Sequence, residues 1–246
     1  MIVRLIITSL FLILCWWLFV FAFDLPTYIL PSPELVFIRL INSMPLLLDH
    51  CYITLSEIIV GFISGTSLGI LTACLMLYFP FFRLMIHPLL LITQTIPVFV
   101  IAPLIILWCG YGMISKIIMI TLLLYFKIAS TVYDGLCRTP FQFLEMAQLM
   151  RANRFKTLLY IQFPSALPQL FSGLKLGAVF APIAALVGEW IGASRGIGFL
   201  ILDAYTRVDM PLLFAALFVH ILMSVAFYHL VLLSTQKFTP WIQEKS

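Results

Sequence analysis

The side chains in this sequence that could do chemistry are few, because only 10% of the 246 residues are charged. Glu57 and Glu189 fall within or at the end of long apolar runs. An intramembrane carboxylate is costly and usually faces a cavity or a partner. We therefore expect Glu57 and Glu189, together with the amide Gln94, to line a translocation pathway or its gate. A structural pair or an interfacial position is the alternative for Glu57.

Lys127 also lies inside an apolar run, in the half predicted to be nearer the cytoplasm. A lysine there can extend its aliphatic stem and place the ammonium among the headgroups. The simplest interpretation of Lys127 is therefore such an interfacial position.

Motifs of metal and nucleotide chemistry are absent from the sequence. It has no HExxH and no paired aspartates on an apolar run, which disfavours an intramembrane enzyme. It also has no GxxxxGK[ST], so ATP would have to bind to a partner and no cofactor is expected on this chain. The five scattered cysteines form no CxxC pair and are interpreted as small apolar residues.

The composition places the chain in a membrane. The sequence is 63% hydrophobic, against about half in an ordinary soluble domain. Its apolar runs approach the ~20 residues of a spanning helix, whereas barrel strands would show ~10-residue alternating segments. The net charge of +4 could suggest nucleic acid, but the basic residues sit in short loops, where membrane orientation explains them better.

Six apolar runs are predicted to span the membrane, at about 5–23, 53–78, 86–108, 113–133, 173–191 and 212–234. The first run is longer than the core of a signal peptide and is interpreted as an uncleaved span. Residues 24–50 hold four prolines and are predicted to form an outer loop with short helical pieces. Pro97 and Pro103 are expected to bend the third span, and Pro182 the fifth.

The distribution of basic residues predicts the orientation. With six spans and the N-terminus inside, nine lysines and arginines lie on the inner side and four on the outer side, Lys127 being left out. This positive-inside bias places both termini in the cytoplasm. The four outer residues are Arg39, Lys116, Arg195 and Arg207.

The longest inner loop, about 134–172, has its own predicted structure. Thr139 is expected to cap a short helix, with Pro140 at its first position and Gln142 completing a capping box. That helix would run to about Met150, and Asn153 would separate it from a second short helix over 154–163. Pro164 and Pro168 are expected to end the second helix. This hairpin is interpreted as a docking surface, with an amphipathic helix on the lipid surface as the alternative.

Glycines mark close contacts elsewhere. Gly61, Gly65 and Gly69 recur every four residues and predict a helix-packing face, within one subunit or between two. Gly192, Gly196 and Gly198 predict tight turns or close helix contact after Trp190.

The inner loop resembles a known signature. Glu145-Met146-Ala147, Arg151-Ala152-Asn153 and Phe163-Pro164-Ser165-Ala166-Leu167-Pro168 are similar to the EAA motif of binding-protein-dependent ABC importer permeases. Met146 replaces a family alanine, and Arg151 replaces the family glycine. The resemblance implies a coupling surface that docks into an ATPase subunit. Its residues here would be Glu145, Ala147, Leu149, Met150, Arg151, Ala152, Asn153 and Arg154.

Further segments resemble the subgroup that imports nitrate, sulfonates, taurine and thiamine precursors. They are Leu30-Pro31-Ser32-Pro33, residues 96–112 and residues 188–198. With Thr54-Leu55-Ser56-Glu57, they are most similar to permeases for the thiamine pyrimidine precursor, of the hydroxymethylpyrimidine type. Taurine and alkanesulfonate permeases share nearly all of these segments and remain the alternative. A secondary transporter is disfavoured because no internal repeat is seen.

The resulting expectation is an all-α polytopic membrane protein with about six transmembrane helices and a cytoplasmic coupling hairpin, similar to type I ABC importer permeases. Residues 1–52 would hold the first span and outer loop, 53–236 the permease core, and 237–246 a cytoplasmic tail. The implied partners are a cytoplasmic ABC ATPase subunit, a periplasmic or lipid-anchored substrate-binding protein and a second copy of the chain. The implied location is the bacterial inner membrane.

Overall fold

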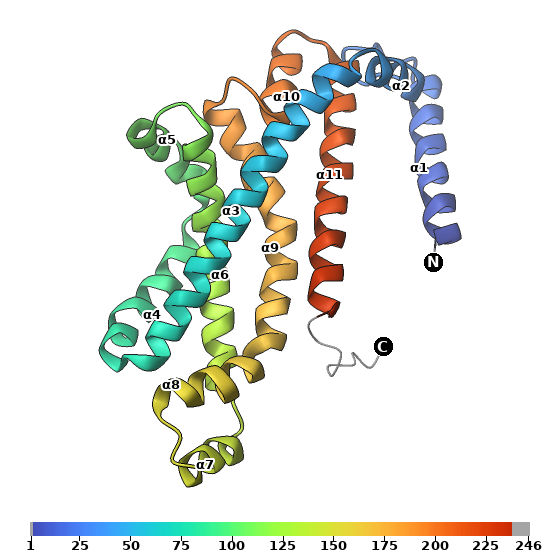
Figure 1. Cartoon of the computed structure of the whole chain (residues 1–246). Helices are drawn as coiled ribbons and strands as arrows, with labels where there is room; N and C mark the ends of the chain where they lie inside the picture. The colour runs from blue at the N-terminus through green and yellow to red at the C-terminus, as the bar shows by residue number, and fades with distance from the viewer. Residues whose placement is uncertain (1, 238–246) are drawn as a thin grey trace.

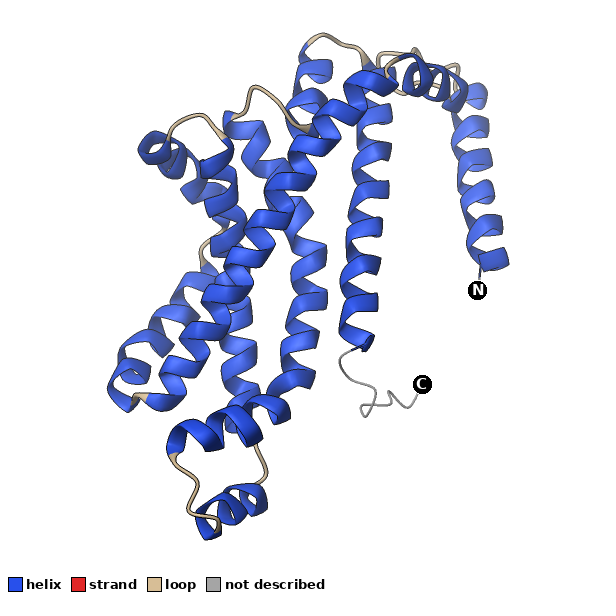
Figure 2. Cartoon of the chain, in the orientation of Figure 1, coloured by secondary structure: helices blue, strands red, loops and turns tan. Residues whose placement is uncertain are grey.

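The computed structural model describes residues 2–237, except the side chains of residues 2–6, 9, 94, 95 and 98. Every element found in this range is helical (Figure 2). In chain order the helices are α1 (Ile2–Ala22), α2 (Pro33–Asn42), α3 (Met44–Tyr78), α4 (Pro80–Thr95), α5 (Val98–Cys109), α6 (Met113–Cys137), α7 (Phe141–Leu149), α8 (Arg154–Thr157), the π-helix η1 (Leu158–Gln162), α9 (Phe163–Gly192), α10 (Ile197–Thr206) and α11 (Met210–Lys237).

Within the described residues, four helical segments are long and apolar enough to cross a membrane. They are Met44–Tyr78, Met113–Cys137, Arg154–Gly192 and Met210–Lys237. The first predicted span corresponds to α1, whose described apolar segment, Leu10–Ala22, is shorter. The second span begins at Met44, earlier than the predicted residue 53, because Pro45 occupies the first turn, where its missing N–H is harmless. The predicted tail after Lys237 lies outside the described residues.

The third apolar run is two helices, which corrects the expected single bent span. α4 ends at Thr95, and both Ile96 and Pro97 are extended, with ψ angles of 119° and 125°. A residue before proline is driven out of the helical region by the proline ring, so the chain breaks here. Pro103 and Pro182, by contrast, lie inside the uninterrupted helices α5 and α9.

The helix α6 is the centre of the bundle and packs against α3 and α9 (Figure 1). The glycine face of α3 makes this contact, so it lies within one subunit. A Cβ at Gly65 would approach the Leu124 Cβ to 2.9 Å, and one at Gly69 would approach the Ile128 Cβ to 2.9 Å. These glycines therefore bring the two helices into backbone-level contact.

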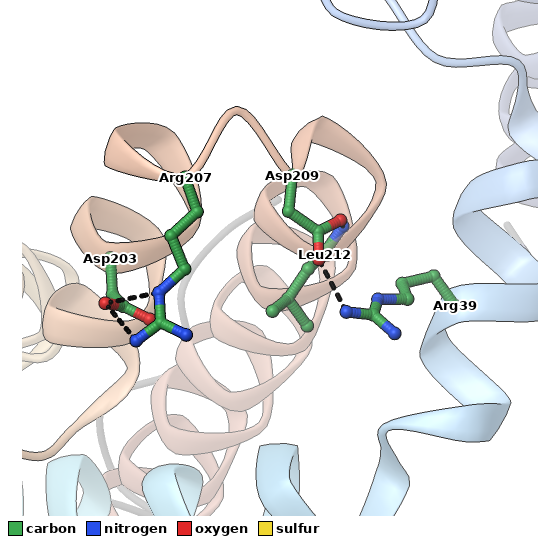
Figure 3. A network of polar contacts seen from close by, with 5 residues as sticks. All are labelled: Arg39, Asp203, Arg207, Asp209 and Leu212. Carbon is green, nitrogen blue, oxygen red and sulfur yellow. Dashed lines mark hydrogen bonds and ion pairs between the residues drawn. The ribbon is translucent and has the colours of Figure 1, made fainter.

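The two ends of the bundle differ. α2, α10 and the α5–α6 loop lie at one end, and the α7–α8 hairpin projects from the other (Figure 1). At the first end, the Arg39 guanidinium of α2 pairs with Asp209 at 2.5 Å, just before α11 (Figure 3). Arg207 pairs with Asp203 at 3.0 Å one turn back in α10. The start of α1 and the end of α11 point toward the hairpin end.

Candidate functional site

The hairpin of residues 139–163 begins differently from its prediction. Thr139 is not the helix cap, because its hydroxyl donates backwards to the Leu136 carbonyl at 2.9 Å. Pro140 occupies the cap position of α7 instead, and no described side chain caps that helix. The predicted capping box with Gln142 is therefore wrong, although the helix itself ends at Leu149, within a residue of its predicted end.

Arg151 makes the turn between the two short helices. Its φ angle is +55°, in the left-handed region that glycine adopts freely. The Ala152 N–H donates to the Ala147 carbonyl and the Arg151 N–H to the Gln148 carbonyl, each at 2.9 Å. This pair of bonds is a Schellman motif, whose left-handed position is usually glycine. The tight turn is therefore present here with arginine at the glycine position.

Asn153 starts the second helix. Its side-chain oxygen accepts from the Lys156 N–H at 2.8 Å, which makes it the N-cap of α8. The expected end of this helix at Pro164 and Pro168 is wrong, since the chain stays helical from Arg154 to Gly192. The π-turn of η1 precedes Pro164, and its wider i→i+5 pattern gives the proline ring room that a regular α-helical turn would not.

The hairpin leaves apolar side chains exposed at the end of the molecule. Leu149 is 86% exposed, and Phe141, Met150 and Phe155 are also exposed. Ala147, in contrast, is 1% exposed, so its small size serves packing inside this chain. Glu145 is exposed and forms no ion pair with Arg154 in the described part of the chain, which leaves its carboxylate available to a partner. Leu149 is therefore a sharper probe of docking than Ala147.

A second polar group of residues, which we name the outer polar cluster, comprises His50, Thr54, Glu57, Lys116 and Glu189. It lies at the end opposite the hairpin, where α3, α6 and α9 meet the α9–α10 loop. All five side chains are buried.

Glu189 and Thr54 cap the start of α10. The Glu189 carboxylate accepts from the Gly198 N–H at 2.5 Å and from the Thr54 hydroxyl at 2.6 Å. Thr54 in turn accepts from the Ile197 N–H at 2.8 Å. Gly196, with φ +113°, brings the loop against this carboxylate, where any Cβ would collide with it. The glycine-rich turn predicted here is confirmed.

Lys116 brings a positive charge to the same place. Its ammonium donates to the Gly192 carbonyl at the end of α9 and faces the carboxylates of both Glu57 and Glu189. Lys116 was counted among the basic residues of the outer side; it lies in the first turn of α6 and is 1% exposed. One buried ammonium therefore lies near two buried carboxyl groups, and Glu57 Oε2 has no hydrogen-bond partner within the described part of the chain.

His50 completes the cluster. Its Nδ1 lies 3.0 Å from the Gly196 backbone nitrogen, in position to accept that hydrogen bond. His50, Thr54 and Glu57 have the i, i+4, i+7 spacing of one helix face. That spacing was the available signal for the cluster, whereas nothing in the sequence pairs Lys116 with α3.

The predicted pathway residues divide into two groups. Glu57 is 2% and Glu189 1% exposed, so neither carboxylate lines an open surface in this conformation. Gln94 lies in α4, and its side chain is outside the described part of the structure. Glu189 on α9 is instead bonded to Thr54 of α3 and to the Gly198 N–H at the start of α10.

Comparison with known proteins agrees with this architecture. The family model described as "Binding-protein-dependent transport system inner membrane component" matches residues 65–244. A probable ABC transporter permease of Haemophilus influenzae is 40% identical over 217 residues, covering 88% of this chain and 89% of that protein. A formylaminopyrimidine transport permease of Halalkalibacterium halodurans is 35% identical over 215 residues, covering 87% of this chain and 86% of that protein.

A solved structure has the same fold. A chain of the MetNI methionine ABC transporter, in an inward facing conformation, superposes with a TM-score of 0.66. The match covers 81% of this chain and 97% of that chain, at 19% identity.

Proposed function

Because this chain belongs to the family of binding-protein-dependent transport system inner membrane components, we propose that it forms the path of a small organic molecule through the bacterial inner membrane. The chain is a permease subunit of an ABC importer. Such a subunit needs a surface through which an ATPase can move it. The observation that supports our proposal most is the hairpin of residues 139–163, a hydrogen-bonded turn with exposed apolar side chains at one end of the bundle.

The proposed partner at the hairpin is a cytoplasmic ABC ATPase subunit. Exposed Leu149, Met150 and Phe141 give it apolar contact area, and exposed Glu145 gives it a carboxylate that a cation of the partner can meet. The residues Arg151, Ala152, Asn153 and Arg154 set the angle between the two short helices. ATP would bind to that partner, and two copies of this chain would enclose the path.

The proposed orientation follows from the same assignment. If the hairpin faces the cytoplasm, both termini do so too, since α1 begins and α11 ends toward the hairpin end (Figure 1). The opposite end, with α2, α10 and the α5–α6 loop, would then meet a periplasmic or lipid-anchored binding protein. The buried position of Glu57 and Glu189 supports a role in the outer gate rather than in lining an open path.

The proposed substrate is a thiamine pyrimidine precursor of the hydroxymethylpyrimidine type. It is supported by the 35% identity to the formylaminopyrimidine permease over most of both chains. A taurine, alkanesulfonate or nitrate importer is the alternative, because those permeases share the same motifs.

The test is uptake by the purified permease with its ATPase and binding protein in proteoliposomes. We expect ATP-dependent accumulation of radiolabelled hydroxymethylpyrimidine or formylaminopyrimidine, and no accumulation with a non-hydrolysable ATP analogue. Radiolabelled taurine serves as the comparison solute. Accumulation of taurine with no pyrimidine uptake would replace the proposed substrate by the alternative, and pyrimidine uptake without ATP would contradict the ATP-driven mechanism.

A further inference from the structure

Lys127 is a charged residue in the middle of a spanning helix that neither the hairpin nor the outer polar cluster uses. It lies within α6 and is partly exposed. Its ammonium sits 3.2 Å from the centre of the Phe180 ring on α9. No hydrogen bond or ion pair to the ammonium is found among the described residues.

The direction of the Lys127 side chain excludes its simplest interpretation. The two helices are antiparallel, with Thr131 of α6 opposite Gly173 of α9 and Leu124 opposite Gly177. The backbone of Lys127 is therefore level with residues 173–177. Phe180 follows Gly177, away from the hairpin end. Side chains in a helix lean toward its N-terminus, which in α6 is also away from the hairpin. The Lys127 ammonium therefore points along α6 away from the hairpin end, and not back toward the nearer membrane interface.

The ring contact leaves most of the ammonium's bonding capacity unused. An ammonium has three N–H donors, and one aromatic face engages only part of them. Val179 and Ile183, beside Phe180 on α9, are about half exposed, at 48% and 51%, so the described residues leave this face of α9 uncovered. A cation on such a face is too costly against lipid and is expected to face water or a partner.

We propose that Lys127 and Phe180 form a solute-binding site on the wall of the translocation path, which rests on the proposed function of the chain. The solute is a planar heteroaromatic molecule. Its ring stacks on Phe180, and its ring nitrogen or carbonyl oxygen accepts a hydrogen bond from the Lys127 ammonium, which leaves the ring face as the solute arrives. A pyrimidine has both features, a flat ring and acceptor nitrogens.

The first experiment tests water access and needs no substrate. Lys127→Cys is made in a variant lacking the native cysteines, assembled with the ATPase and treated with a charged, membrane-impermeant thiol reagent with and without ATP. We expect Lys127→Cys to react in at least one nucleotide state. Val225→Cys, on a 49% exposed position in the middle of α11, is the control and should stay unreactive. An unreactive Lys127→Cys in both states would overturn the site.

The second experiment measures pyrimidine uptake by Lys127→Met and Lys127→Arg. Loss of a charged hydrogen bond should raise KM for the pyrimidine by about tenfold or more in Lys127→Met, and Lys127→Arg should restore much of it. ATPase activity should persist in both. Unchanged KM in Lys127→Met would overturn the binding role even if the position is wet. If the wild type transports only taurine, the proposed substrate is wrong. A reactive Lys127→Cys would in that case still place Lys127 on the pathway, but the heteroaromatic solute would be contradicted.

Discussion

At the scale of single residues, the outer polar cluster depends on a balance of buried charge. Lys116 is the ammonium that faces Glu57 and Glu189, and it also holds the end of α9 through the Gly192 carbonyl. A buried charge left without its partner is strongly destabilising, whereas a buried pair is nearly neutral overall. Glu57 and Glu189 also share a side-chain hydrogen bond, while the second Glu57 oxygen, Oε2, has no partner among the described residues. Lys116 is therefore the residue of the cluster whose loss should destabilise the chain most.

Lys116→Met should destabilise the chain by about 3–5 kcal/mol, because it leaves two carboxylates buried without a cation. Glu57→Gln is the matched control: it keeps the shape of the side chain and leaves Glu189 balanced against Lys116. Thermal unfolding of the two purified variants in detergent would show a large loss of Tm for the first and a small change for the second. Equal stability of Lys116→Met and the wild type would contradict this charge balance.

Uptake by Glu57→Gln also tests the gate. If Glu57 belongs to the outer gate, Glu57→Gln should lower uptake while assembly with the ATPase is kept.

At the scale of elements, the hairpin turn has the hydrogen bonds of a Schellman motif although Arg151, and not glycine, occupies its left-handed position. The Schellman bonds of Ala152 and Arg151 fix the exit from α7, and Asn153 caps α8 immediately afterwards. The backbone geometry is thus held on both sides of Arg151. A non-glycine residue in the left-handed region costs roughly 1–2 kcal/mol, which the surrounding bonds offset.

Arg151→Gly should therefore stabilise the hairpin by about 1 kcal/mol and keep ATPase binding. Arg151→Ala separates the two effects of the change, since it removes the guanidinium but retains the backbone cost. Hydrogen exchange at the amides of residues 147–153 should slow in Arg151→Gly and not in Arg151→Ala. Loss of ATPase binding in both variants would instead identify the guanidinium as a direct contact.

Much of the element order could be predicted from the sequence because the apolar runs and the loop prolines are local signals. The second, fourth, fifth and sixth runs correspond to spanning helices, and the short helix before Met150 is where its pattern indicated. The break at Ile96 could not be separated from a bend, because both follow from proline. Continuity through Pro164 depended on the π-turn, which has no sequence pattern of its own. Lys116 joins Glu57 only through tertiary packing of α6 against α3 and α9.

At the scale of the whole molecule, the two candidate regions lie at opposite ends of one tightly packed core. The α3–α6 contact through Gly61, Gly65 and Gly69 and the α6–α9 contact form a continuous helical body between them (Figure 1). A force applied to the hairpin enters α9 directly, since Arg154–Gly192 is one continuous helix. That helix ends at Gly192, whose carbonyl Lys116 holds. α9 is therefore the direct mechanical link between the proposed ATPase surface and the proposed outer gate.

The most direct test of this account is whether the hairpin carries the ATPase. Leu149→Asp places a charge on an 86% exposed apolar position, and Phe81→Asp does the same on a 75% exposed position at the start of α4, outside the hairpin. Co-purification and ATP-driven uptake are measured for both. We expect Leu149→Asp to weaken ATPase binding by about tenfold or more, as for a contact at the centre of an interface, and Phe81→Asp to bind as the wild type does. Full ATPase binding and full transport by Leu149→Asp would contradict the assignment of the hairpin as the coupling surface.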